Sequence, residues 1–170
     1  MTFEQAIDHV TDKEGGFTKD PDDSGNWTSG VIGKGILKGT KKRISAGSYP
    51  DLDIEKLTDA EIYTIYRRDF WNAVKAEYLP PQIRLHVLDF AVNAGQQTAR
   101  VLLQKIVELK QDGIFGPATL NAASKTTPWQ YAQGRIDHYN AVVIKYPVKR
   151  KYFYGWMKRN LAVTELCFKS

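Results

Sequence analysis

The stretch "HVTDKEGGFTKDPDD", residues 9–23, decides the fold because a helical pattern stops in it and a polar segment begins. Apolar residues before it recur at the spacing of one helix face: Phe3, Ile7 and Val10. Glu14 continues that face four residues later, and Gly15-Gly16 supplies the stop that glycine commonly gives a helix. We therefore expect a first helix whose last turn places an acid on its buried side.

The segment from residue 17 to about residue 50 is rich in Gly, Asp, Ser, Thr and Lys and has no helical period. Its short apolar patches "GVIGKGI" (30–36) and "RISA" (43–46) are candidate strands of a small sheet or hairpin. This part of the chain therefore predicts a small β or irregular element between two helices.

The remainder of the chain predicts a series of helices. In residues 57–74, Thr58 and Glu61 form a capping box, and Thr127 with Pro128 starts another helix. Helical patterns occupy residues 57–74, 81–95, 96–110, 117–123, 127–146 and 151–168. Trp129 is interpreted as a core residue. The fold class is therefore α+β and mainly α-helical.

Composition restricts the function classes. The chain has 170 residues, enough for one domain or one domain with a small lobe, and a net charge of +5, which favours anionic partners. A single cysteine, Cys167, rules out an internal disulfide, and the three histidines lack metal-ligand spacing. No apolar run approaches the roughly 20 residues of a membrane span, and we expect no signal peptide and no cofactor.

Glu14 has the features expected of a catalytic acid. Partial burial raises the pKa of a carboxyl group, and the negative end of a helix dipole acts in the same direction. Both effects favour a group that donates a proton near neutral pH. Gly15 and Gly16 carry no side chains, so a bulky substrate can approach closely. The alternative is a surface acid beside a glycine stop.

Glycoside hydrolysis pairs such an acid with a second carboxylate that stays ionised. Asp20, Asp22 and Asp23 are the candidates, because they follow on a polar turn near lysines. Turn chemistry alone also accounts for this acidic run, so from the residues alone both interpretations stay open.

The motifs "EGGF" (14–17), "DPDD" (20–23), "GNWT" (25–28) and "TKKRIS" (40–45) together resemble the N-acetylmuramidases of glycoside hydrolase family 108. That family includes many phage endolysins, and this form is similar to those of phages that infect Gram-negative bacteria. The segments "YRRDFWNA" (66–73), "LDFAVNAG" (88–95), "QDGIFGPATLNA" (111–122) and "YFYGWMKRN" (152–160) extend the resemblance. It implies a lysozyme-like fold, with a catalytic part in residues 1–80 and a peptidoglycan-binding part in residues 81–170, packed as one unit.

The resemblance also implies residue roles. Glu14 becomes the catalytic acid, Asp23 or Asp22 the second carboxylate, and Thr40 or Thr28 the residue that helps to hold the attacking water. Arg43 departs from the family, whose members usually have glycine there, and this puts the local strand geometry and Thr40 in question. The expected substrate-binding residues are Asn26, Trp27, Thr28, Tyr49 and Asn93.

These roles predict an endolysin that cleaves the β-1,4 bond between N-acetylmuramic acid and N-acetylglucosamine. A lytic transglycosylase and a non-catalytic wall-binding module are the alternatives. We expect a monomer that waits in the host cytoplasm for a holin, acts in the periplasm and does not bind nucleic acid. Basic residues near the C-terminus are expected to contact anionic outer-membrane lipid: Lys149, Arg150, Lys151, Lys158 and Arg159.

Overall fold

The computed structural model describes residues 1–11 and 16–169. It divides into two compact units, one of residues Thr2–Arg67 and one of Arg68–Ser170 together with Met1. Glu14 and Gly15 lie outside the described residues, so the prediction that Glu14 extends the buried face of the first helix is untested. The functional division into residues 1–80 and 81–170 also stays a prediction.

In the first unit, helix α1 (Phe3–Thr11) buries the face that the sequence predicted. Phe3, Ile7 and Val10 are almost completely inaccessible, and the guanidinium of Arg67 lies 3.9 Å from the centre of the Phe3 ring. The apolar spacing therefore identified both the helix and its buried face.

Helix α2 (Asp59–Tyr66) begins with the predicted capping box, in which Thr58 Oγ1 accepts from Glu61 N and Glu61 Oε2 accepts from Thr58 N. It ends earlier than its pattern suggests. A π-helical turn, η2 (Arg67–Trp71), follows, and then a 3₁₀ turn, η3 (Ala76–Tyr78). Lys75, with a left-handed φ of 49°, separates the two. The sequence pattern could not reveal this break because single π turns inside helices are rare and have no distinct apolar period.

The polar segment holds a three-stranded antiparallel sheet in the order β1 (Phe17–Thr18), β2 (Thr40–Lys41) and β3 (Ile44–Ser45). Thr18 pairs with Thr40, which pairs in turn with Ser45. A 3₁₀ turn, η1 (Ser24–Asn26), precedes β2. The candidate strand in 43–46 is present as β3, but the one in 30–36 is wrong. That segment forms turns, and three of its glycines have positive φ.

Arg43, where glycine was expected, lies in the turn between β2 and β3. Lys42 and Arg43 both adopt left-handed φ values, 44° and 65°, which is the pattern of a two-residue type I′ hairpin turn. Arg43 thus keeps the conformation in which glycine is usual. The hydroxyl of buried Tyr66 donates to Lys42 O at 2.8 Å, and Lys42 Nζ lies 2.8 Å from Asp59 Oδ1. These contacts attach the hairpin to α2.

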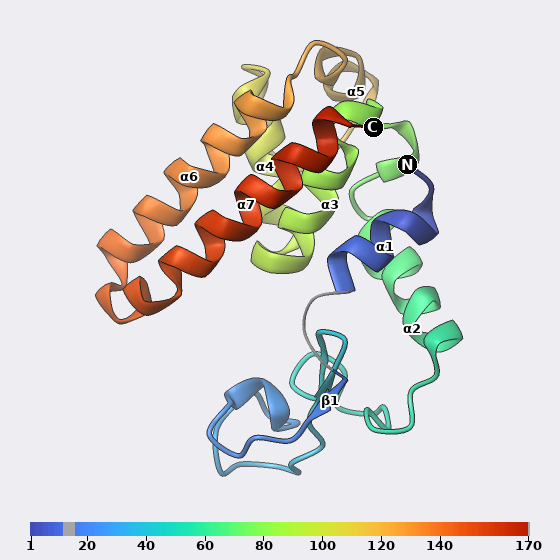
Figure 1. Ribbon diagram of the computed structural model, residues 1–170, viewed down its shortest axis with the longest axis vertical. Coiled ribbons are helices and arrows are strands. Elements are labelled where there is room, and N and C mark those ends of the chain that lie inside the picture. Colours follow the sequence, from blue (N-terminus) through green and yellow to red (C-terminus); the bar gives the residue numbers. More distant parts are fainter. Residues whose placement is uncertain (12–15, 170) are drawn as a thin grey trace. The chain divides into compact units, whose positions relative to one another are not determined.

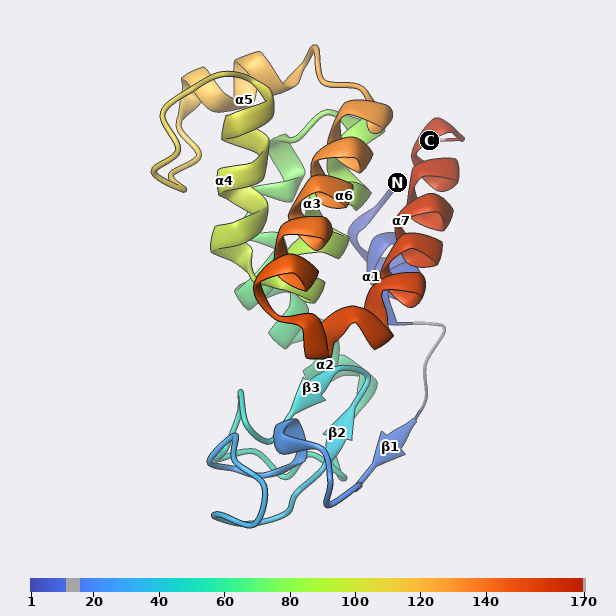
Figure 2. The same ribbon diagram turned by 90° about the vertical axis from the view of Figure 1, so that its left-hand side faces the viewer.

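The second unit is a helical bundle (Figure 1). It contains α3 (Pro81–Ala94), α4 (Gln96–Ile106), α5 (Pro117–Ala123), α6 (Pro128–Lys145), the 3₁₀ turn η4 (Pro147–Tyr152) and α7 (Phe153–Phe168). Helices α6 and α7 lie side by side and antiparallel, and α5 lies at the end of the bundle away from η4 (Figure 2). The capping box at Thr127 is present, but Trp129, expected in the core, is 60% exposed. It lies in the first turn of α6, between the buried residues Pro128 and Tyr131.

A buried cluster of charges joins three helices of this bundle. Asp89 on α3 lies 2.7 Å from Arg135 Nη2 on α6 and 2.5 Å from Arg159 Nη2 on α7. Arg135 also donates to the hydroxyl of Tyr139. Burial alone would raise the pKa of Asp89, but the two guanidinium groups outweigh it and hold that pKa below its usual range. The carboxylate therefore stays ionised inside the bundle.

Replacing Asp89 by Asn should lower the free energy of unfolding by about 3–5 kcal/mol, because two buried or half-buried cations lose their counter-charge. The pKa of Asp89 is depressed in the folded state, so its contribution is fully present above the ordinary carboxyl pKa. That contribution is lost as the pH falls through the folded value. Urea unfolding of wild type and Asp89→Asn at neutral and acid pH measures both effects.

Asp137→Asn is the matched control. Asp137 lies exposed on α6, where its Oδ1 accepts a 3.2 Å hydrogen bond from Gln133 Nε2. Its loss should change the free energy of unfolding by less than about 0.5 kcal/mol. Equal losses in the two variants would show that the Asp89 cluster does not hold the bundle together.

Candidate active site in the first unit

Asn26 is the centre of the candidate site and is completely buried. Its side-chain Nδ2 donates to Asp20 O at 2.9 Å, and its Oδ1 accepts from Thr40 Oγ1 at 2.6 Å. Its main-chain carbonyl accepts from Lys38 N at 2.9 Å and from Gly39 N at 3.0 Å. One residue therefore connects the loop of residues 20–23, which we call the acidic loop, to strand β2.

The acidic loop ends in a helix cap. Asp23 is the N-cap of η1, and its Oδ1 accepts from Gly25 N at 2.9 Å, while Asp20 Oδ1 accepts from Asp22 N at 2.9 Å. A Cβ built on Gly25 would lie 3.3 Å from Asp23 Oδ1 and 3.7 Å from Ser45 Cβ. Asp23 is exposed, and Gly25 lies between its carboxylate and the end of β3.

Thr40 lies on strand β2, next to the end of β3. It faces Ser45 across the β2–β3 pair, and directly opposed residues of an antiparallel pair point to the same face of the sheet. Asp23 and Thr40 are both bonded to Asn26, Asp23 through its main-chain carbonyl, which accepts from Asn26 N at 3.1 Å, and Thr40 through its hydroxyl. Because Thr40 donates its hydroxyl proton to Asn26 Oδ1, the oxygen of that hydroxyl keeps its lone pairs for another donor.

Thr28 has a different environment. Its Oγ1 accepts from Ile36 N at 2.9 Å, and its main-chain N donates to Ile36 O at 2.9 Å. These two bonds close the 28–36 loop. The hydroxyl of Thr28 thus bonds within its own loop, whereas that of Thr40 donates to Asn26 Oδ1.

The aromatic candidates are half-buried. Trp27 Nε1 donates to Pro21 O at 2.8 Å, which fixes the indole against the acidic loop. Tyr49 follows β3, where its main-chain N donates to Ser45 O at 3.0 Å. Both rings thus belong to the segments that frame Asp23.

Asn93 lies on α3 in the second unit, where its Oδ1 accepts from the hydroxyl of Tyr139 at 3.3 Å. Glu14 lies outside the described residues. The structure therefore brings together Asp23, Asn26 and Thr40, with Trp27, Thr28 and Tyr49 on the segments around them.

Two lysines near the site bond to main-chain carbonyls of a neighbouring loop, which composition could not reveal. Lys38 Nζ donates to Pro50 O at 2.6 Å, and Lys41 Nζ donates to Glu55 O at 2.9 Å and to Leu57 O at 2.7 Å. These ammonium groups hold the 50–57 loop against the sheet. A sequence-level count of basic residues overstates the charge available to an anionic substrate here.

Sequence reasoning also missed Ser45 and Gly39 as parts of the site. Gly39 has a φ of 89°, and a Cβ there would lie 2.4 Å from Thr18 O and 2.6 Å from Phe17 Cε2. The dipeptide Gly39-Thr40 was a usable signal, because glycine in a strand commonly marks close backbone approach. In the described part of the chain, no group of three or more His, Cys, Asp or Glu side chains is arranged to hold a metal ion.

Comparisons with known proteins identify the family of the chain. The profile of the family described as "Glycosyl hydrolase 108" matches residues 7–95, and the chain belongs to this family. A second profile, "Predicted Peptidoglycan domain", matches residues 93–161. The chain is therefore a glycoside hydrolase of family 108 with a peptidoglycan-binding domain, as its motifs predicted.

A solved structure described as "Structure of Brucella abortus SagA" is 26% identical to the chain and superposes with a TM-score of 0.78. The alignment covers 98% of this chain and 94% of that one. The predicted mainly helical, lysozyme-like α+β fold is confirmed. A search of curated proteins found no significant match.

Gly39→Ala should destabilise the first unit more than Gly30→Ala, although both positions have positive φ. At Gly30 nothing lies within 4 Å of the added Cβ, so the cost is the left-handed penalty of about 1–2 kcal/mol. At Gly39 steric overlap with β1 adds about 1–3 kcal/mol. Urea unfolding curves of the two variants measure the difference, and equal midpoints would contradict the close approach of β1 and β2.

Proposed function

We propose that the chain hydrolyses the β-1,4 bond between N-acetylmuramic acid and N-acetylglucosamine in peptidoglycan. Membership of family 108 and the match to a peptidoglycan domain support the substrate class. The observation that carries the reaction is the 2.6 Å hydrogen bond from Thr40 Oγ1 to Asn26 Oδ1, because Asn26 N also donates to the main-chain carbonyl of the exposed residue Asp23 at 3.1 Å. It prepares a position for one water molecule.

The proposed water lies between Asp23 and Thr40. The Thr40 hydroxyl donates its hydrogen bond to Asn26 Oδ1, so its oxygen is available to accept one hydrogen of the water. The Asp23 carboxylate accepts the other hydrogen. The lone pair of the water then points toward the anomeric carbon of the sugar, as a general-base mechanism requires.

In this reaction Glu14 protonates the glycosidic oxygen while the bond from that oxygen to the anomeric carbon breaks. The water oxygen forms a bond to the anomeric carbon, and Asp23 receives the proton that the water releases. Glu14 is left ionised and Asp23 protonated, and proton exchange with solvent restores both. The role of Glu14 rests on the sequence motif, since this residue lies outside the described part of the chain.

Two other functions use parts of the same site. A lytic transglycosylase needs the acid but no second carboxylate and leaves anhydro ends, and a wall-binding module releases no fragments. The bond from Thr40 to Asn26 favours hydrolysis over both, because neither alternative requires a held water.

Digestion of purified peptidoglycan, followed by mass spectrometry of the fragments, tests the proposal. Glu14→Gln and Asp23→Asn should each slow fragment release by about 10²–10⁴-fold, because each removes a proton-transfer group. Thr40→Val should also release fragments slowly. Thr40→Ser retains the hydroxyl and should keep most of the activity.

Asp22→Asn is the matched control for Asp23→Asn, and circular dichroism checks that each variant folds. Fragments with reducing muramic acid ends support hydrolysis. Anhydro ends, or wild-type rates in Glu14→Gln or Asp23→Asn, contradict the mechanism.

We also propose that the chain takes part in lysis of Gram-negative hosts and contacts anionic outer-membrane lipid through the surface at η4. We call this surface the basic turn, residues 144–154. Exposed apolar side chains gather there, Ile144, Val148, Tyr152 and Tyr154, between the cations Lys145, Lys149, Arg150 and Lys151. No Asp or Glu occurs from residue 138 to residue 164.

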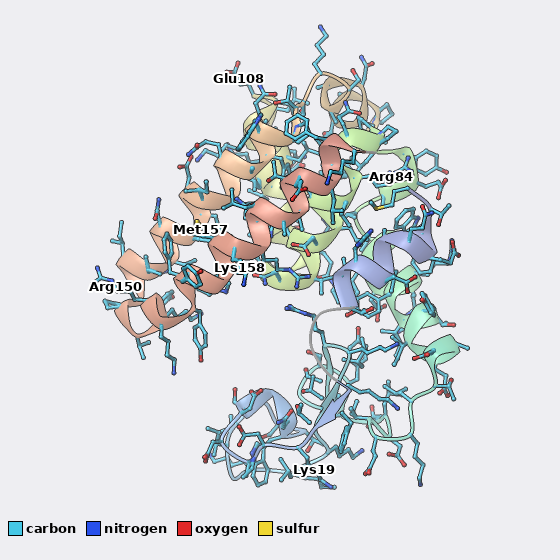
Figure 3. All side chains as sticks on the ribbon, viewed as in Figure 1. Lys19, Arg84, Glu108, Arg150, Met157 and Lys158 are labelled. Atoms are coloured by element: carbon cyan, nitrogen blue, oxygen red, sulfur yellow. The ribbon has the colours of Figure 1, made fainter. Side chains whose placement is uncertain are left out.

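Apolar side chains among cations suit the interface of an anionic bilayer, where the stems enter and the charges meet headgroups. Arg150 lies at the far end of the α6–α7 pair, and Lys158 lies further along α7 (Figure 3). Arg159 differs from the other expected lipid contacts, because it is bound to Asp89. No helix in the described part of the chain is long and apolar enough to cross a bilayer.

The triple variant Lys149→Gln, Arg150→Gln, Lys151→Gln should bind vesicles containing anionic lipid about 100-fold more weakly, at roughly 1 kcal/mol per cation. Co-sedimentation with anionic and with neutral vesicles measures the effect. The control is Lys105→Gln, Lys110→Gln, Lys125→Gln, which changes the net charge equally outside the basic turn. Equal binding of the two triple variants would refute the lipid contact.

A further inference from the structure

The second unit contains a cavity of about 500 Å³ that none of the proposed catalytic residues lines. One wall comes from the segment 71–78, around the end of η2 and η3, and the other from α5. The two walls belong to different matched regions, because 71–78 lies in the glycosyl hydrolase match and α5 in the peptidoglycan domain match. Its volume is in the range of ligand sites.

The cavity has an apolar body. Trp71 is almost fully buried, and Pro117 and Leu120 contribute from α5. Tyr78 also lines the cavity and is 72% exposed. An exposed tyrosine beside a buried tryptophan leaves apolar and aromatic surface that a ligand can cover.

Opposite charges line the same cavity. Lys75 and Glu77 are exposed and two residues apart, and neither has an ion-pair partner among residues 1–11 and 16–169. Lys75 adopts a left-handed φ of 49°, which is uncommon for a residue with a side chain. Such strain occurs often at ligand sites, where the surrounding structure maintains it.

The segment that carries these charges is held in place by α3. Arg84 Nη2 donates to Glu77 O at 3.2 Å and to Leu79 O at 3.0 Å, and its guanidinium lies 5.9 Å from the centre of the Trp71 ring. Tyr78 N donates to Lys75 O at 2.9 Å. Arg84 is labelled in Figure 3 beside this segment. The cation and the anion are therefore presented on a fixed backbone, which lowers the entropy cost of binding.

We propose that this cavity binds the stem peptide of peptidoglycan at a diaminopimelate residue, whose side chain ends in both an ammonium and a carboxylate group. Glu77 pairs with the ammonium, Lys75 with the carboxylate, and the methylene chain lies along Tyr78 and Leu120. This inference rests on the proposed function for its substrate. A lysine-containing stem offers only the ammonium, and the uncharged part of a glycan chain offers neither group.

Calorimetric titration with L-alanyl-γ-D-glutamyl-meso-diaminopimelate tests the proposal. A second peptide carries a carboxamide in place of the diaminopimelate side-chain carboxylate. Wild type should bind the amidated peptide about tenfold or more weakly, since a charge-assisted hydrogen bond is lost. Lys75→Gln should bind both peptides equally weakly, because the group that senses the carboxylate is gone. Glu77→Gln should weaken both peptides, and Lys105→Gln should match wild type.

The inference is overturned if wild type binds neither peptide, binds both equally, or if Lys75→Gln still distinguishes them. Because binding is measured without cleavage, these outcomes are separate from failure of the proposed function. Peptide binding with no fragment release from peptidoglycan would refute the hydrolase and leave the cavity assignment intact. Fragment release without peptide binding would refute the cavity assignment and leave the hydrolase proposal intact.

Discussion

The buried amide of Asn26 is the constraint on which the candidate site depends. Asn26 connects two segments that are distant in the sequence, because its side-chain amide bonds to Asp20 O and to the hydroxyl of Thr40, and its main-chain carbonyl accepts from Lys38 N and Gly39 N. A buried amide left without partners costs about 1–3 kcal/mol for each unsatisfied group, so the loss of either side-chain contact would destabilise this arrangement. The position of Asp23 relative to Thr40 follows from that requirement. A short sheet of two-residue strands could not fix it alone.

The second unit uses charge for a comparable purpose. Asp89 holds Arg135 and Arg159 across three helices inside the bundle. Buried ion pairs often contribute little net stability compared with apolar residues of the same size, but they are strongly destabilising when one partner is removed. The two units therefore share a design in which one polar residue, fully satisfied, sets the geometry of several elements.

The parts of the fold that depend on local patterns could be predicted from sequence. Phe3, Ile7 and Val10 identified α1, and the capping box at Thr58 and the pair Thr127-Pro128 marked two helix starts correctly. Features that depend on distant contacts could not be predicted. The candidate strand at 30–36 failed because glycines there adopt positive φ, and the exposure of Trp129 depends on where α6 packs. In the site, motif order suggested Asp23 and Thr40, but only the fold separates the environment of Thr40 from that of Thr28.

The central claim is that a water held between Asp23 and Thr40 attacks the anomeric carbon, and the anomeric configuration of the first product tests it most directly. Proton NMR during digestion of a soluble glycan strand records that configuration before mutarotation obscures it. Attack by a water on the face opposite the leaving group inverts the β linkage, so the account predicts the α-anomer first. Initial release of the β-anomer would contradict it, because retention requires a covalent or substrate-assisted intermediate in place of the held water.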